Sequence, residues 1–317
     1  MKIKSLFKTK EFLKNPHVQT ILTQYLPYPV KPIFRQEKFE LSDGDFLELY
    51  FSGDLHKGIV LVLHGILGEL DSHYMLFSYE GLEELGLGGV FIKARGAGGS
   101  INRTPRFFNA ADTRDLHEVI VYLQQRFPGV PLFAVGYSLG GVILTKYLAE
   151  QDRPLIAAMV VSIPFDLKFC VDHFQSYPGK MYADYMIRHL RKKMMKKFQA
   201  HPGVVNLKQL RKVRTFPQFD NLVTAPMNGY RDAEDYYYQG SPKHYLKHIK
   251  TPLLIVHAMD DPIVRPEVIP REEDLSEHVT LEISDCGGHL GFIADIKDLK
   301  AEYWIKTRMK EFFTAHS

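Results

Sequence analysis

Ser138 lies in a Gly-Tyr-Ser-Leu-Gly sequence at residues 136–140, between the apolar run 132–135 and an amphipathic segment at 138–150. In this context the pattern predicts a sharp, strained turn from a strand into a helix, because glycines tolerate backbone approaches that other residues do not. A serine on such a turn points clear of the sheet, and the helix N-terminus offers N–H groups to a developing oxyanion. Ser138 is therefore the candidate nucleophile.

A serine hydroxyl becomes a good nucleophile when a base takes its proton and a third group orients that base. His289 is the candidate base, since it stands between glycines after the strand-like run 279–284. Asp261 is the candidate orienting acid, because it follows the apolar run 253–257. Its neighbour Asp260 is the alternative, and Asp261 would then cap the turn.

A third element of the candidate site is the sequence His-Gly-Ile-Leu-Gly at residues 64–68, directly after the run 59–63. We expect the backbone N–H of Ile66 to pair with that of Leu139 as an oxyanion hole. The alternative is an ordinary turn from a strand to a helix. His64 is expected to support this loop by hydrogen bonds instead of titrating during catalysis.

The elements that must position these residues alternate along the chain. Short apolar runs at 59–63, 90–92, 132–135, 157–162 and 253–257 are typical of buried parallel strands, and helical patterns lie between them at 112–127 and 138–150. This order predicts a doubly wound and mostly parallel α/β sheet, and the Gly-x-Ser-x-Gly turn within it favours the α/β-hydrolase fold. We expect a single domain over 1–317, with a mostly helical lid inserted at approximately 164–245.

Composition excludes several classes of partner and site. The net charge is only +3 over 317 residues, which does not favour a nucleic-acid partner. The chain has two cysteines, too few for a disulfide framework, and no clustered metal ligands, and its glycine-rich tracts lack the context of a nucleotide site. No cofactor and no metal are therefore expected. The apolar runs are too short to span a membrane, and lysines interrupt the N-terminal apolar residues before they reach the length of a signal-peptide core. We therefore expect a cytoplasmic protein, with peripheral contact to a membrane as an open alternative.

Residues 187–198 form a basic amphipathic segment within the expected lid. Ile187, Leu190, Met194 and Phe198 share one helical face. One interpretation is a helix that covers the core and has solvated cations, and the alternative is weak contact with an anionic membrane surface. Under both interpretations, five basic side chains are expected on the lid surface away from the nucleophile: Arg191, Lys192, Lys193, Lys196 and Lys197.

Taken together, these residues resemble the YheT-like branch of the α/β-hydrolases, which includes bacterial YheT proteins and eukaryotic abhydrolase-domain 1 and 3 proteins. The resemblance covers nearly the whole chain. Its most specific tracts are 15–22, 95–116, 219–226 and 233–237.

This resemblance implies a Ser-Asp-His triad on Ser138, Asp261 and His289 and an activity toward esters, with some members acting on lipids or transferring acyl groups to alcohols. The family often has a histidine near Asn109, a cysteine near Ala97 and an asparagine near Val142, and this chain departs at all three. These departures leave the triad intact, but they bear on which substrate it accepts.

The expected function is hydrolysis of a small-molecule or lipid-like carboxylic ester through an acyl-enzyme. Acyl transfer to an alcohol by the same residues is an alternative. A non-catalytic binding protein is a second alternative, although the intact order of serine, aspartate and histidine argues against it.

Overall fold

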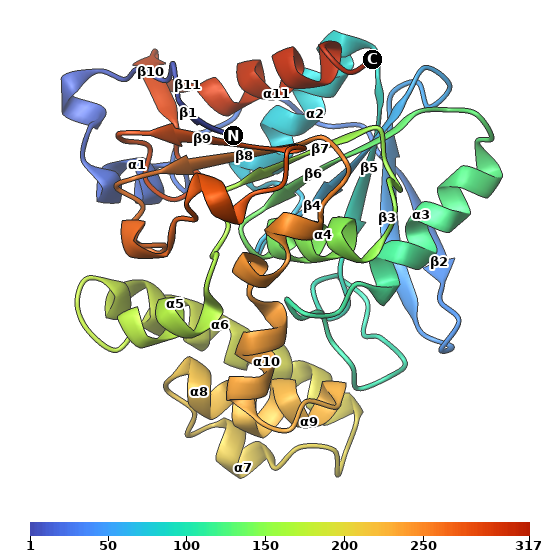
Figure 1. The fold of residues 1–317 in the computed structure, drawn as a ribbon. Helices are drawn as coiled ribbons and strands as arrows, with labels where there is room; N and C mark the ends of the chain where they lie inside the picture. Colours follow the sequence, from blue (N-terminus) through green and yellow to red (C-terminus); the bar gives the residue numbers. More distant parts are fainter.

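A computed structural model describes all 317 residues of the chain, and its centre is a nine-stranded sheet with the order β1-β9-β8-β7-β6-β4-β5-β3-β2 (Figure 1). All neighbouring strands pair in parallel except at β3, which is antiparallel to both β2 and β5. The strands of this sheet are β1 (Lys2–Lys4), β2 (Arg35–Glu40), β3 (Phe46–Ser52), β4 (Ile59–Leu63), β5 (Gly88–Lys93), β6 (Leu132–Tyr137), β7 (Ala157–Val161), β8 (Leu253–Ala258) and β9 (Val279–Ser284). The mostly parallel sheet expected from the sequence is confirmed.

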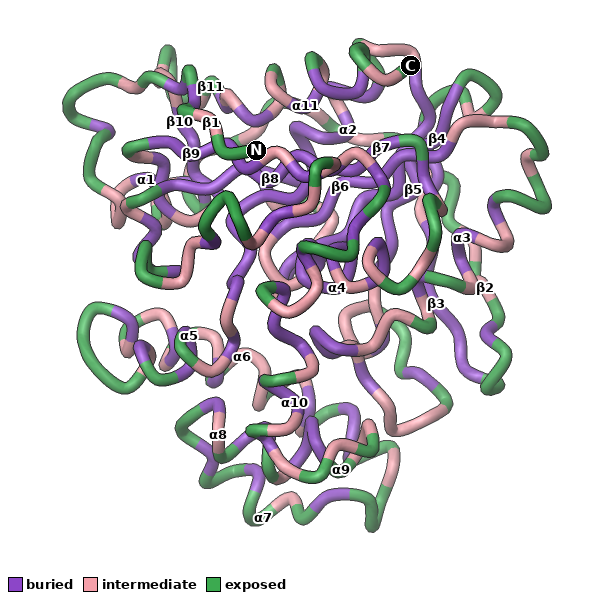
Figure 2. Tube along the Cα trace, in the orientation of Figure 1, coloured by how far each residue is buried: buried purple, intermediate pink, exposed green.

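The central strands are buried on both faces because their residues alternate between two hydrophobic cores. In β4, Ile59, Leu61 and Leu63 belong to the larger core, whereas Val60 and Val62 belong to the smaller one. This arrangement explains why the strand has no polar residues, since either face of a parallel sheet is covered by helices. Figure 2 shows the sheet strands buried and the exposed residues concentrated on the outer loops and helices.

Helices cover both faces of the sheet (Figure 1). Two of them, α3 (Arg114–Arg126) and α4 (Leu139–Glu150), contribute to the larger core. On the opposite face, α2 (His73–Leu85) packs against α11 (Trp304–Thr314), and both contribute to the smaller core. A short hairpin, β10 (Ile293–Lys297) and β11 (Lys300–Tyr303), precedes α11. The sheet is therefore doubly wound, as expected.

A helical segment connects β7 to β8 and lies on one side of the sheet (Figure 1). Its helices are α5 (Leu167–His173), α6 (Gly179–Ala200), α7 (Leu207–Leu210), α8 (Phe216–Phe219), the π-helical turn η2 (Asp220–Thr224), α9 (Ala225–Asn228) and α10 (Ala233–Gly240). We call this segment the helical insertion. Its role as a lid remains a prediction.

The remaining helix, α1 (Pro16–Leu22), precedes the first long strand. Single-turn 3₁₀ helices complete the structure: η1 (Glu11–Leu13), η3 (Pro242–His244), η4 (Leu246–His248), η5 (Pro266–Val268) and η6 (Glu272–Asp274). None of the helices combines the length and the apolar character needed to span a bilayer.

Candidate active site

Ser138 stands at the junction between β6 and α4, with φ 50 and ψ −120. Glycines make this turn possible. A Cβ on Gly136 would lie 2.6 Å from the Cα of Gly141, and a Cβ on Gly140 would lie 2.5 Å from the carbonyl oxygen of His64. Such distances are far below van der Waals contact with backbone that cannot move away. The Gly-x-Ser-x-Gly sequence therefore has the strained geometry that its context predicted.

The structure brings the three expected side chains together in one hydrogen-bonded series. The Nε2 atom of His289 lies 3.1 Å from Ser138 Oγ, and its Nδ1 atom lies 2.8 Å from Asp261 Oδ2. The other Asp261 oxygen accepts from the N–H groups of Ile263 and Val264 at 2.8 and 3.0 Å. Burial alone would raise the pKa of the Asp261 carboxyl, but His289 and these hydrogen bonds hold it below its ordinary value. A carboxylate of this kind is suited to stabilising an imidazolium.

The neighbouring aspartate has a different position. Asp260 Oδ1 accepts a hydrogen bond from the backbone N–H of Gly288 at 2.9 Å. Burial raises the pKa of Asp260 to about 6. Of the two candidates for the orienting acid, only Asp261 has a carboxylate in contact with the imidazole of His289. This contact supports Asp261 over Asp260 as the orienting acid. The catalytic role of Asp261 remains a prediction.

The loop after β4 lies directly against the nucleophile. A Cβ on Gly65 would be 3.1 Å from the Cβ of Ser138, so the next residue, Ile66, starts beside the serine. His64 supports this loop, since its Nδ1 lies 2.7 Å from the Gly65 carbonyl oxygen and its Nε2 accepts from the Ala94 N–H at 3.2 Å. Burial lowers the pKa of His64 to about 4, so this imidazole stays neutral at physiological pH. The oxyanion-hole role of Ile66 and Leu139 remains a prediction.

Comparison with known proteins places this chain in a family. Residues 58–295 match the family model of the alpha/beta hydrolase fold. The chain belongs to the α/β-hydrolase family. Within it, the chain is 37% identical to YheT of Escherichia coli (strain K12), a candidate esterase, over 95% of this chain and 91% of that protein. It therefore falls in the YheT-like branch that its sequence resembles.

A second relative of this α/β-hydrolase is named as a phospholipase, and a solved esterase structure shares its fold. It is 29% identical to phospholipase ABHD3 of Mus musculus, over 94% of this chain and 75% of that protein. Among solved structures, the Pyrococcus furiosus esterase Pf2001 is 17% identical and superimposes with a TM-score of 0.59, over 90% of this chain and 93% of that one. At that identity the likeness shows a shared fold. The chain is thus an α/β-hydrolase of the esterase and lipase type.

A large cavity adjoins the nucleophile. Its volume is about 470 Å³, and Ser138, His289, Ile66 and Leu139 are among the residues that line it. Of 41 lining residues, 25 are hydrophobic, and many come from the helical insertion. The space next to the serine is therefore mainly apolar, which suits a hydrocarbon group better than a charged one.

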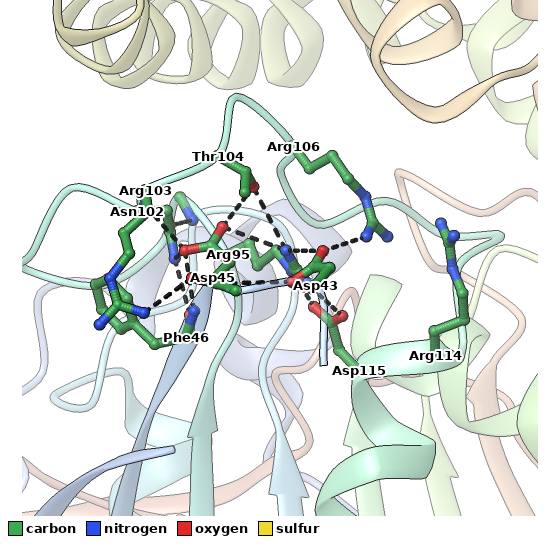
Figure 3. Close-up of polar contacts among 12 residues, drawn as sticks. Asp43, Asp45, Phe46, Arg95, Asn102, Arg103, Thr104, Arg106, Arg114 and Asp115 are labelled. Atoms are coloured by element: carbon green, nitrogen blue, oxygen red, sulfur yellow. Dashed lines mark hydrogen bonds and ion pairs between the residues drawn. The ribbon is translucent and has the colours of Figure 1, made fainter. Parts of the chain in front are cut away.

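One wall of the cavity comes from the tract 95–116, which a buried ion-pair network holds in place (Figure 3). Arg95 donates to both oxygens of Asp115 at 2.7 and 2.8 Å, and to Asp43 and Asp45 at 2.7 and 3.2 Å. Its side chain is only 2% exposed. Because a buried guanidinium needs such partners, the network ties the start of this tract to the loop before β3 and to the first turn of α3, where the tract ends.

Two of the five basic side chains expected on the surface of the lid lie elsewhere. Lys193 lines the same cavity as the nucleophile and pairs with Glu69, and Lys197 is buried. The expectation that these two side chains lie on the surface away from the site is therefore wrong. Both positions adjoin the apolar face of the helix, and long aliphatic stems pack well there. In contrast, Lys192 and Lys196 are exposed.

A polar group that the sequence analysis missed lies in the part of the cavity wall that the helical insertion forms. Asp220, in the π-helical turn η2, accepts a hydrogen bond from the Tyr237 hydroxyl at 2.7 Å and another from Thr224. Burial raises the pKa of Asp220 to about 6. The contact between Asp220 and Tyr237 joins two helices that the sequence does not show to be neighbours. The only signal for it was that both residues lie in tracts that resemble the family, 219–226 and 233–237.

Proposed function

We propose that this α/β-hydrolase cleaves carboxylic esters through an acyl-enzyme on Ser138. The observation that carries the proposal is the series of contacts from Asp261 through His289 to Ser138, which ends in an apolar cavity. Relatives named as an esterase, a phospholipase and a lipase support the same reaction class. A protein that only binds a ligand has no need for a base placed within hydrogen-bond distance of a strained serine.

The mechanism follows from these positions. Ser138 Oγ attacks the ester carbonyl carbon while His289 Nε2 takes the hydroxyl proton, and Asp261 stabilises the imidazolium that forms. The N–H groups of Ile66 and Leu139 stabilise the negative carbonyl oxygen, and His289 then protonates the departing alkoxide. In the second half, water loses a proton to His289 and attacks the acyl-enzyme carbonyl carbon. His289 then returns this proton to Ser138 Oγ as the bond to the serine breaks and the acid leaves.

The cavity indicates the kind of ester. Its mainly apolar lining fits an ester with a hydrocarbon acyl group, either a small molecule or a lipid-like one. Because the helical insertion contributes much of this lining, we further propose that residues 164–245 act as a lid within a single domain over 1–317. The insertion would then determine which acyl groups reach Ser138.

The test is covalent labelling by a fluorophosphonate probe together with hydrolysis of a soluble chromogenic ester. We expect the wild-type protein to be labelled and Ser138→Ala to lose both labelling and hydrolysis while its circular dichroism spectrum is unchanged. The variant keeps every other serine, so it controls for non-specific reaction. Full labelling of Ser138→Ala would contradict the assignment of the nucleophile.

Acyl transfer to an alcohol uses the same residues and differs only in which acceptor attacks the acyl-enzyme. Product analysis with a short alcohol in the assay separates the two reactions, because transfer yields a new ester and hydrolysis yields an acid. We expect mainly acid.

A further inference from the structure

The loop that carries His289 has an unusual backbone conformation. Positive φ angles occur at Gly287 and Gly288, and also at two residues with side chains, Leu290 with φ 60 and Phe292 with φ 44. L-residues rarely adopt this region, so surrounding contacts must stabilise the loop. Two of these contacts come from the ends of sheet strands: Asp260 accepts from the Gly288 N–H, and Ser162 Oγ accepts from the Leu290 N–H at 3.2 Å.

Three further backbone contacts come from α1, some 270 residues earlier in the chain, in addition to those of residues such as His73, whose Nε2 lies 2.8 Å from the Leu290 carbonyl oxygen. Thr20 Oγ1 accepts a hydrogen bond from the backbone N–H of His289 itself at 2.9 Å and donates to the Pro16 carbonyl at 2.8 Å. Gln19 accepts from the N–H of Ile293 at 2.8 Å and donates to the carbonyl of the same residue at 3.0 Å. Neighbouring residues of one short helix thus bond to the catalytic histidine and to the end of its loop.

The backbone of the histidine loop lies in close contact with α1, so these hydrogen bonds need no bridging group. A Cβ on Gly288 would lie 2.6 Å from the Pro16 carbonyl oxygen and 2.7 Å from Thr20 Oγ1. A Cβ on Gly291 would lie 2.5 Å from the Gln19 carbonyl oxygen. The two glycines on either side of the histidine are therefore needed where the loop meets α1, in addition to any local turn requirement.

The sequence of α1 explains how so short a helix keeps this position. Asn15 caps it by accepting from the N–H groups of His17 and Val18, and Pro16 occupies its first turn. His17 Nδ1 also lies 2.7 Å from the Tyr182 hydroxyl of α6. The helix is therefore anchored at its start, and it lies between the histidine loop and the helical insertion.

We propose that α1 is a clamp on the catalytic histidine, in which Thr20 and Gln19 are positioning residues that set the place of the His289 backbone and hence of its imidazole. This inference rests on the proposed ester hydrolysis. It extends the active site to a segment outside residues 58–295, the span matched by the family model. It also gives a physical reason for the Asn-Pro-His-Val-Gln-Thr sequence at 15–20, which contains no residue of the candidate triad.

The test compares Thr20→Val with Thr20→Ser. Valine has the shape of threonine but cannot accept from the His289 N–H, whereas serine keeps the hydroxyl. We expect Thr20→Val to lower kcat on a soluble ester about tenfold at unchanged KM, because small displacements of a catalytic group are costly to the chemical step. The rate of fluorophosphonate labelling should fall in parallel. Thr20→Ser should remain near the wild type in both measurements, as should Thr307→Val, a matched change on the exposed face of α11.

Urea denaturation of each variant separates positioning from folding. A folded Thr20→Val protein with wild-type kcat would overturn the clamp, and so would an equal loss of activity in Thr20→Ser. If Thr20→Val is too unstable to assay, a Thr20→Ser variant with unchanged kcat supports the clamp through its retained acceptor. A wild-type protein that neither hydrolyses esters nor takes the probe would instead overturn the proposed function, and the clamp with it.

Discussion

Asp260 and Asp261 are adjacent residues that contact different parts of the same histidine loop. Asp261 bonds to the imidazole of His289, and Asp260 bonds to the backbone N–H of Gly288. A pair of this kind cannot be resolved from the sequence, because both residues follow the same strand and both suit a turn. Their hydrogen-bond partners distinguish an orienting acid from a loop support.

This distinction predicts a ranking of two matched variants. Asp261→Asn should lower kcat by about 10⁴, because an amide at that position favours the wrong tautomer of the histidine. Asp260→Asn should have a much smaller effect, since the amide oxygen can still accept from the Gly288 N–H. Steady-state kinetics on a soluble ester measures both values. A larger loss in Asp260→Asn would show that the roles are reversed.

The three residues proposed as the triad could be found in the sequence because each stands in a local pattern of strand and turn. The residues that support them could not. Thr20 and His289 are 269 positions apart, and no local pattern indicates that a short helix near the N-terminus packs against a loop near the C-terminus. The resemblance to a family marked the tract 15–22 as specific, but only the packing explains it.

Among secondary-structure elements, the buried parallel strands were predictable and the outer strands were not. Runs such as β4 are wholly apolar because both faces are covered. In contrast, β2 alternates between exposed and half-buried residues, and β1 has only three residues. Strands at the edge of a sheet lack the continuous apolar signal on which the prediction depended.

The position of α6 was also only partly predictable. The periodicity of its sequence identified the apolar face of the helix, but it did not show that Lys193 and Lys197 point inward.

The π-helical turn η2 leads to a prediction about stability and pH. Asp220 has a pKa of about 6, above its ordinary value of 3.8, so the folded state binds its proton more tightly than the unfolded state. Its contribution to the free energy of unfolding is therefore complete below about pH 4 and is lost as the pH rises through 6. A difference of about two pKa units corresponds to about 3 kcal/mol for a buried group.

Asp220→Asn removes this ionisation and keeps an oxygen that can accept from Tyr237. We expect the decrease in urea midpoint between pH 4 and pH 7 to be smaller in the variant than in the wild type. Asp260, whose pKa is also raised, should preserve part of the decrease. Identical pH profiles for both proteins would show that Asp220 does not titrate in this range.

On the scale of the whole molecule, the cavity and the outer face of α6 form one continuous surface. Four apolar or aromatic residues line the cavity and are also exposed to solvent: Ile21 on α1, Tyr25 just after it, and Met181 and Tyr185 on α6. Farther along the same helix, three of the exposed residues are basic: Arg188, Lys192 and Lys196. An apolar rim therefore lies beside a short basic stripe. One interpretation of α6 is that this stripe contacts an anionic membrane surface, and the other is that its cations are only solvated.

The variant that separates them replaces Arg188, Lys192 and Lys196 by glutamine and leaves Lys193 and Lys197 in place. Turnover of a small soluble ester should be unchanged, because the three side chains are exposed and do not line the cavity. Contact with an anionic membrane predicts weaker sedimentation with vesicles that contain phosphatidylserine, since each cation near such a surface contributes about 1 kcal/mol. This loss should disappear in high salt and on neutral vesicles. A solvated helix face predicts equal sedimentation of both proteins at low salt, and that result would contradict membrane contact through α6.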